Sequence, residues 1–220
     1  GDFENDTFVP FDYGYFAFVY DTEVIETPPA SLKELVESDS DLKIAIQDPR
    51  TSTPGLGLLL WVKAVYGDDA AGAWSKLQDK VLTVTPGWSE AYGLFTSGEV
   101  PMVLSYTTSP AYHRIAEDTE RYKAAGFAEG HYLQVEVAAL VESSDNKTLA
   151  REFLDFMLTA DFQRHIPLKN VMYPAVELGD ELPDVFDKLI TPSEALYIDP
   201  AKVATIRRQL VNDWLDALTD

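Results

Sequence analysis

Apolar residues recur along the chain with two different spacings, which predict alternating strands and helices. Short, nearly continuous apolar runs are typical of buried strands, and they occur at residues 8–20, 43–46, 82–85, 102–106 and 131–141. Helical spacing or helix-start signals occur at residues 31–38, 55–66, 69–80, 149–166, 185–190 and 200–218, and after Ser89 and Pro110. Strands separated by helices predict βαβ units and a mostly parallel α/β sheet.

Three of the predicted strands run directly into the start of a helix through segments rich in hydroxyl groups. These junctions read DPRTSTPG at residues 48–55, TPGWSE at 85–90 and YTTSP at 106–110. Ser and Thr side chains cap helix starts, and Ser89 is the predicted cap of the second helix. Free N–H groups and the helix dipole also attract anions there, at the strand ends where ligands bind in such sheets. The three junctions therefore predict an anion-binding site.

Other segments show neither spacing, and they are predicted to be a loop (123–130) and an irregular stretch (167–183). Gly14 interrupts the first strand, which indicates a close approach of backbone or ligand. Glu136 lies within the last strand, where its carboxylate must be solvated, paired or directed at a cleft. His113 is expected on the exposed face of its helix.

Composition and charge narrow the possible partners. The chain has 220 residues, 46% of them hydrophobic, which is enough for a core. Its 37 acidic and 17 basic residues give a net charge of −20, which argues against nucleic acid and anionic membrane surfaces as partners. The charge is compatible with a cationic ligand or with a salt-rich habitat.

Residue types also exclude some chemistry within this chain. Cysteine is absent, so the chain holds no disulfide, no thiolate metal site and no cysteine nucleophile. The three histidines lack metal-ligand spacing, and no metal site is expected. No apolar run approaches the roughly 20 residues that a membrane span requires.

Four motifs carry a resemblance to a known family: DPRTSTPGLGLLLWVKAVYGDDA, GWSEAYGLF, LSYTTSPAY and EGHYLQVEVAA. In order and spacing the chain resembles the thiamine-binding proteins of bacterial ABC importers, and the likeness includes FVPFDYGYFAFVYD near the start. The resemblance implies the α/β fold of type II periplasmic binding proteins, in which crossing strands join two lobes around a ligand. Members of this family carry roughly a hundred further residues, the size of a modest domain, before the equivalent of Gly1.

The chain is therefore expected to be the carboxyl-terminal part of such a protein, with a mostly complete second lobe and the returning part of the first. By the resemblance, residues 1–14 and 125–185 form the partial first lobe with its hinge strands. Residues 15–124 and 186–220 form the second α/β lobe. Such an incomplete lobe is expected to self-associate or to bind a separate chain that carries the missing segment.

The resemblance also assigns binding positions one by one. It implies phosphate contacts for the hydroxyls of Ser52 and Thr53 and a ligand contact for Trp88. It also implies ligand contacts for the segment Tyr106, Thr107, Thr108 and Ser109, and contact of the Tyr112 ring with the thiamine rings. The thiazolium of thiamine is flat and cationic, so aromatic faces attract it. Helix capping alone also explains the hydroxyl residues, and packing alone also explains the aromatic ones.

The implied function is a non-enzymatic, substrate-binding subunit that delivers thiamine, its monophosphate or its pyrophosphate to a membrane permease. No cofactor is required, and the expected location is the periplasm, free or lipid-anchored. One alternative is an enzyme like thiaminase I, whose cysteine nucleophile would lie in the missing part. Another is a binding protein for a different solute such as ferric iron, which the non-adjacent Tyr106 and Tyr112 disfavour.

Overall fold

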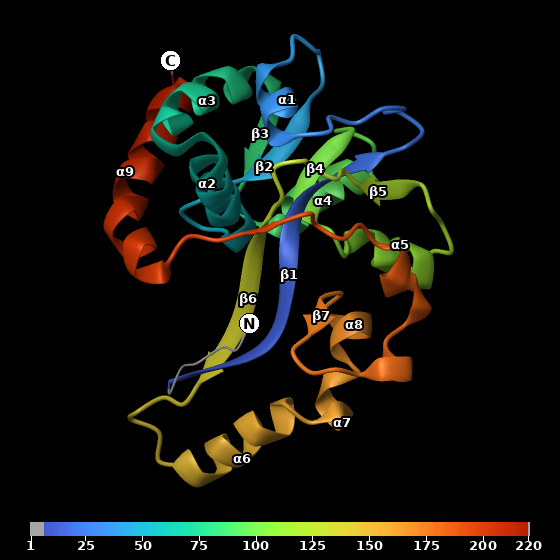
Figure 1. The fold of residues 1–220 in the computed structure, drawn as a ribbon, viewed down its shortest axis with the longest axis vertical. Helices are drawn as coiled ribbons and strands as arrows, with labels where there is room; N and C mark the ends of the chain where they lie inside the picture. The colour runs from blue at the N-terminus through green and yellow to red at the C-terminus, as the bar shows by residue number, and fades with distance from the viewer. Residues whose placement is uncertain (1–6, 220) are drawn as a thin grey trace.

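The computed structural model describes residues 7–219, so the first six residues of the predicted first lobe lie outside the described part. Figure 1 shows the arrangement of helices and strands. In chain order they are β1 (Phe8–Asp21), α1 (Leu32–Glu37), β2 (Ile44–Gln47), α2 (Thr53–Tyr66), η1 (Gly67–Asp69), α3 (Ala70–Leu77), η2 (Gln78–Lys80), β3 (Val81–Thr85), α4 (Trp88–Thr96), β4 (Met102–Tyr106), α5 (Ser109–Ala116), β5 (Tyr122–Ala124), β6 (His131–Ala139), α6 (Lys147–Met157), α7 (Ala160–Gln163), α8 (Ile166–Lys169), β7 (Tyr173–Pro174), η3 (Gly179–Glu181), η4 (Asp184–Lys188), β8 (Ala195–Leu196) and α9 (Pro200–Thr219). Within this described range, none of the helices has the length and apolar character needed to span a membrane.

The sheet combines parallel and antiparallel strands in the order β3-β2-β4-β1-β6-β8. Strand β2 runs parallel to β3 and β4, as the alternation of strands and helices predicts. Strand β1 runs antiparallel to β4 and β6, so the expectation of a mostly parallel sheet holds for its β3-β2-β4 part and for the short β6-β8 pair, but not for β1. Although α1 separates β1 from β2 in the chain, β1 does not pair with β2 in the sheet, because β4 lies between them, and the alternation of elements therefore does not give its direction.

Helices cover both faces of the parallel part of the sheet. On one face, Phe16, Ile44 and Leu104 pack against apolar residues of α1, α2, α3 and α9. On the other face, Ala45 and Val103 pack against α4 and β5. Buried parallel strands with helices on both faces read as continuous apolar runs, which is why their positions are visible in the sequence.

Strands β1 and β6 are the longest in the sheet, as the apolar runs at 8–20 and 131–141 predict. The first half of β1 pairs with β6, and its second half pairs with β4. Figure 1 shows the two strands leaving the helical layers together and leading toward α6, α7 and α8. A β-carbon at Gly14 would lie 2.7 Å from Met172 Cε, so the close neighbour is a side chain, and the predicted approach of backbone or ligand stays a prediction.

The start of α4 differs from the prediction. Gly87 occupies the N-cap position with an extended backbone, and Ser89 lies inside the helix. Trp88 is the first helical residue because its indole Nε1 donates to Ser105 Oγ at 2.8 Å on the neighbouring strand. This tertiary contact outweighs the local preference for a serine cap.

The predicted helix at 149–166 is divided into α6, α7 and part of α8. Thr159 adopts an extended backbone conformation, and its hydroxyl donates to Phe156 O at 2.7 Å at the end of α6. Such a side-chain bond to the backbone competes with helical hydrogen bonding. The apolar spacing continues across the break at Thr159, so the sequence pattern does not indicate the break.

Four further predictions need correction. The loop at 123–130 begins inside β5, which pairs with the end of β1. The irregular stretch at 167–183 contains most of α8, β7 and η3, and the helix at 185–190 is the 3-10 turn η4. His113 is fully buried rather than exposed, and both of its ring nitrogens have polar partners, the buried Tyr92 hydroxyl and the carboxylate of the exposed Glu117.

Candidate ligand-binding site

A cavity of about 760 Å³ lies at the carboxyl ends of β2, β3 and β4. The starts of α2, α4 and α5 form one wall, through residues such as Thr53, Trp88 and Ser109. Strand β6 and the segment after α8 form the opposite wall, through Glu136 and Asn170. The cavity therefore lies where the sequence predicts an anion site, and it is closed by elements that the prediction did not include.

Hydrogen bonds hold the first two junctions together. Asp48 N donates to Thr85 O at 2.9 Å, and Thr51 Oγ1 donates to Pro86 O at 2.7 Å. A β-carbon at Gly55 would lie 2.4 Å from Gln47 O, so only glycine lets the start of α2 pack this closely on the end of β2. The parallel strands bring the three junctions to one edge, and these contacts hold them there.

The second and third junctions share a hydroxyl network. Ser105 Oγ accepts from the Trp88 indole and lies 2.7 Å from Ser109 Oγ. Ser109 Oγ also accepts from Tyr106 N at 3.2 Å. The network orients the indole of Trp88, which is 38% exposed and therefore able to contact a ligand.

Aromatic rings continue from Trp88 into the core. Trp88 stacks on Tyr92 with ring centroids 4.6 Å apart. The Tyr92 hydroxyl and His113 Nε2 are hydrogen-bonded at 2.8 Å, and His113 Nδ1 and Glu117 Oε2 at 2.7 Å. Tyr112 also lines the cavity and is 46% exposed. The cavity thus offers flat apolar surface suited to an aromatic ligand.

The opposite wall is polar and acidic. The Tyr106 hydroxyl donates to Gln134 Oε1 at 2.7 Å, and Gln134 Nε2 donates to Glu136 Oε1 at 3.1 Å. Burial and the neighbouring Glu136 raise the pKa of the Tyr106 phenol. Burial, with Glu136 as the second cause, raises the pKa of the Asp12 carboxyl to about 7. This wall is suited to a cationic or hydrogen-donating group.

Backbone strain occurs at Val171, which lines the same cavity. Its φ is 55°, in the left-handed region, which is a rare conformation for a β-branched residue. Its N–H donates to Ile166 O at 3.0 Å after the end of α8. Strained residues are frequent at binding sites, where the surrounding structure enforces them.

The structure brings five of the eight predicted residues to the cavity wall: Thr53, Trp88, Tyr106, Ser109 and Tyr112. Ser52 is the N-cap of α2, but its side chain makes no capping hydrogen bond, so the capping explanation does not account for it. Thr107 and Thr108 are fully buried beneath the junction. Contact between a ligand and any of the eight residues stays a prediction.

Several cavity residues were not predicted, and some had a sequence signal. Tyr92 lies one helical turn after Trp88, so helical spacing places it beside the indole. Gln134 lies two residues before Glu136 and therefore on the same face of the strand. A position directed at a cleft was one of the three possibilities given for Glu136. Lys169 and Asn170 lie in a stretch with no periodic pattern, and only the fold brings them to the site.

Charge and metal ligands complete the description. Arg50, the basic residue of the first junction, forms a bidentate pair with Asp48 and is thereby engaged outside the cavity lining. Lys169 contributes a cation to the lining. Among residues 7–219, no group of three or more His, Cys, Asp or Glu side chains is arranged to hold a metal ion.

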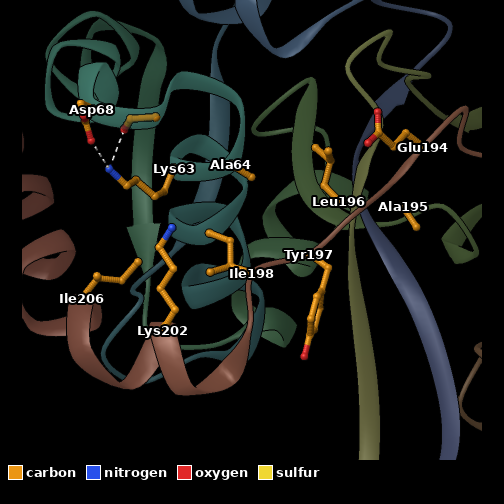
Figure 2. A pocket seen from close by; sticks show the side chains of 11 residues that line it. Lys63, Ala64, Asp68, Glu194, Ala195, Leu196, Tyr197, Ile198, Lys202 and Ile206 are labelled. Atoms are coloured by element: carbon orange, nitrogen blue, oxygen red, sulfur yellow. Dashed lines mark hydrogen bonds and ion pairs between the residues drawn. The ribbon is translucent and has the colours of Figure 1, made fainter. Parts of the chain in front are cut away.

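A second cavity of about 650 Å³ lies between α2, the segment around β8 and α9. Figure 2 shows Lys63, Tyr197 and Lys202 around it. Lys63 Nζ is already bonded to Gly67 O and Asp68 Oδ1 at 2.8 and 3.1 Å. This cavity contains none of the predicted binding residues.

Comparison with known proteins agrees with this geometry. The family model for bacterial extracellular solute-binding proteins matches residues 1–164. Thiamine-binding periplasmic proteins of Brucella abortus and Escherichia coli are 59% and 57% identical over 217 and 219 residues, or 99% and 100% of this chain. The chain spans 65% and 66% of the length of these two curated relatives.

Solved structures show the same fold. A periplasmic thiamin binding protein superposes with a TM-score of 0.96 at 57% identity, with 99% of this chain and 68% of that chain covered. A periplasmic binding protein from Actinobacillus pleuropneumoniae superposes with a TM-score of 0.78 at 19% identity, with 99% and 70% covered, which shows the fold alone. The family match and the fold agree: the chain belongs to the bacterial extracellular solute-binding protein family.

Proposed function

We propose that the protein is the substrate-binding subunit of an ABC importer and that it binds thiamine or its phosphate esters. The relatives at 57–59% identity carry the name thiamine-binding periplasmic protein. In this proposal the protein works in the periplasm, free or lipid-anchored, and transfers its ligand to a membrane permease. It acts by binding, without chemical change to the ligand.

The observation that carries the proposal is the composition of the main cavity. Its aromatic wall, with Trp88, Tyr92 and Tyr112, is suited to the flat rings of thiamine. Its acidic wall, with Glu136, is suited to the positive thiazolium. The start of α2 lines the cavity through Thr53 and Pro54, and Thr53 offers a helix N–H group to a phosphate ester.

We also propose the two-lobed division described above, with residues 1–14 and 125–185 in the first lobe and 15–124 and 186–220 in the second. The course of β1 supports it, because its first half pairs with β6 and β7 and its second half with β4 and β5. A ligand between the lobes would contact both halves. Closure of the lobes around a ligand is the common mechanism of such folds.

Titration calorimetry of the chain with thiamine, its monophosphate, its pyrophosphate and Fe³⁺ tests this proposal. We expect saturable one-to-one binding of at least one thiamine form and none of Fe³⁺. Chromatography of the recovered ligand tests for cleavage and should return it intact. Binding of Fe³⁺ alone, or release of a pyrimidine product, would contradict the proposal.

A further inference from the structure

Two acidic side chains, Asp12 and Glu136, are opposed across the ladder between β1 and β6. Directly opposed residues project from the same face of a sheet and have neighbouring side chains. Glu136 lines the main cavity, so Asp12 lies on the cavity side of the sheet as well. Two carboxylates held as neighbours repel each other when both are ionised.

Asp12 has an incomplete set of hydrogen bonds. It is fully buried, and its Oδ2 accepts from Asn170 Nδ2 at 2.7 Å. Its Oδ1 has no hydrogen-bond partner within the described part of the chain. A buried carboxylate with an unpaired oxygen is costly when ionised, which agrees with the pKa of about 7. Protonation of Asp12 removes both the unpaired charge and the repulsion from Glu136.

Other titratable groups near the pair do not replace the effect of protonating Asp12. Tyr106 of β4 and Tyr173 of β7 both have a raised pKa, mainly because of burial, so both stay neutral near pH 7. Lys169, after α8, lines the same cavity but is exposed, and water screens much of its charge. The charge of the pair near pH 7 therefore depends chiefly on the protonation of Asp12.

We propose that Asp12 and Glu136 form a proton-linked subsite for a cationic group, which is partly protonated at neutral pH when the cavity is empty and becomes fully ionised when the cation binds beside Glu136. A bound positive charge favours the doubly ionised pair by Coulombic attraction. The inference rests on the proposed function, since the thiazolium of thiamine is the cation. The proton passes to solvent, and no bond of the ligand changes.

Calorimetry with thiamine at pH 7, in two zwitterionic buffers of different ionisation enthalpy, tests the linkage. We expect release of about half a proton per ligand, because a group whose pKa is near 7 is half-protonated there. Affinity should be up to about tenfold tighter at pH 8 than at pH 6, since the proton competes with the cation. Asp12→Asn should bind thiamine without proton release and with little pH dependence. The control Asp180→Asn, at an exposed carboxylate, should behave as the unaltered chain.

A second measurement needs no ligand. In ¹³C NMR of the free chain, the Asp12 carboxyl should titrate near neutral pH, and Glu136→Gln should shift this titration toward lower pH. Titration near the ordinary value of about 3.9 would overturn the inference whatever the ligand. Thiamine binding with no buffer dependence would overturn the linkage and leave the proposed function intact. Absence of any thiamine binding would overturn both.

Discussion

At the scale of single residues, the hydroxyl groups of the three junctions have different roles. Ser109 Oγ is engaged with Ser105 Oγ and Tyr106 N, so it maintains the shape of the third junction. The Ser52 side chain makes no capping hydrogen bond at the start of α2. Its hydroxyl is the better candidate for contact with a phosphate.

We predict that Ser52→Ala weakens binding of thiamine pyrophosphate more than binding of thiamine. A lost hydrogen bond to a charged group costs about 1.5–3 kcal/mol, which corresponds to about one to two decades in affinity. Calorimetry with both ligands measures the difference. Ser109→Ala, as a comparison, should lower the melting temperature because it breaks an internal network. Equal losses for both ligands in Ser52→Ala would show a structural role.

Tyr112 separates recognition of the rings from recognition of the phosphate. Its ring is 46% exposed and lines the cavity. Stacking of a heteroaromatic ring on tyrosine contributes roughly 1–3 kcal/mol, with nucleic-acid bases as the analogue. Tyr112→Ala should therefore weaken thiamine and its pyrophosphate by similar factors, on the order of ten to a hundred.

Tyr112→Phe is the matched control, because it retains the ring and removes only the hydroxyl. Calorimetry should show a small loss for this variant with either ligand. A lower melting temperature with unchanged thiamine affinity in Tyr112→Ala would mean that the ring packs its own helix instead of a ligand.

At the scale of elements, the seating of α2 on β2 determines where the first junction lies. The space for a β-carbon at Gly55 is taken by backbone atoms, Gln47 O at 2.4 Å and Asp48 O at 2.8 Å. Backbone atoms at a strand end cannot rotate away as a flexible side chain can. Any larger residue would therefore displace the start of the helix, and with it Ser52 and Thr53.

We predict opposite effects of two glycine-to-alanine changes. Gly55→Ala should destabilise the fold by about 1–3 kcal/mol through overpacking, and it should also weaken ligand binding. Gly72→Ala, in the exposed face of α3 with no atom within 4 Å of the new β-carbon, should stabilise by about 0.5–1 kcal/mol because alanine favours helix. Urea denaturation measures both. Equal stability of the two variants would contradict the close seating of α2.

At the scale of the whole molecule, one surface is unusually apolar. Helix α6 exposes Leu149, Phe153 and Phe156, with 66%, 53% and 45% of their surface accessible. Their helical spacing is the pattern that predicted an amphipathic helix, yet these side chains stay exposed among the described residues, and Figure 1 shows α6 at the end of the molecule away from α1, α2 and α3. An exposed apolar patch of this kind favours association, whereas a net charge of −20 opposes it.

We predict that the chain self-associates through α6 and that added salt strengthens the association by screening the charge. Sedimentation velocity over a range of protein and salt concentrations measures this. Phe153→Ser combined with Phe156→Ser should reduce association, whereas Tyr197→Ser, at another exposed ring, should not. A monomer under all conditions would refute the prediction.

Much of the fold is readable from local patterns because the responsible forces are local. The strands at 44–47 and 102–106 and the helix that ends at Gly67 follow from apolar spacing and from a glycine with φ of 58°. The break at Thr159 and the position of Gly87 could not be predicted in this way. The position of Gly87 accompanies the contact of Trp88 with Ser105 on another strand, and the break at Thr159 accompanies a local side-chain bond that the apolar spacing does not reveal.

The sequence by itself determined the three hydroxyl-rich junctions and the order of the main strands and helices as far as α5, because hydrophobic spacing and helix-start chemistry act between residues close in the chain. It also placed five of the cavity residues through the motifs. Only the tertiary structure decided the direction of β1 and the burial of His113. It also brought Asp12, Glu136 and Asn170 together, because their contacts join segments that are distant in the chain.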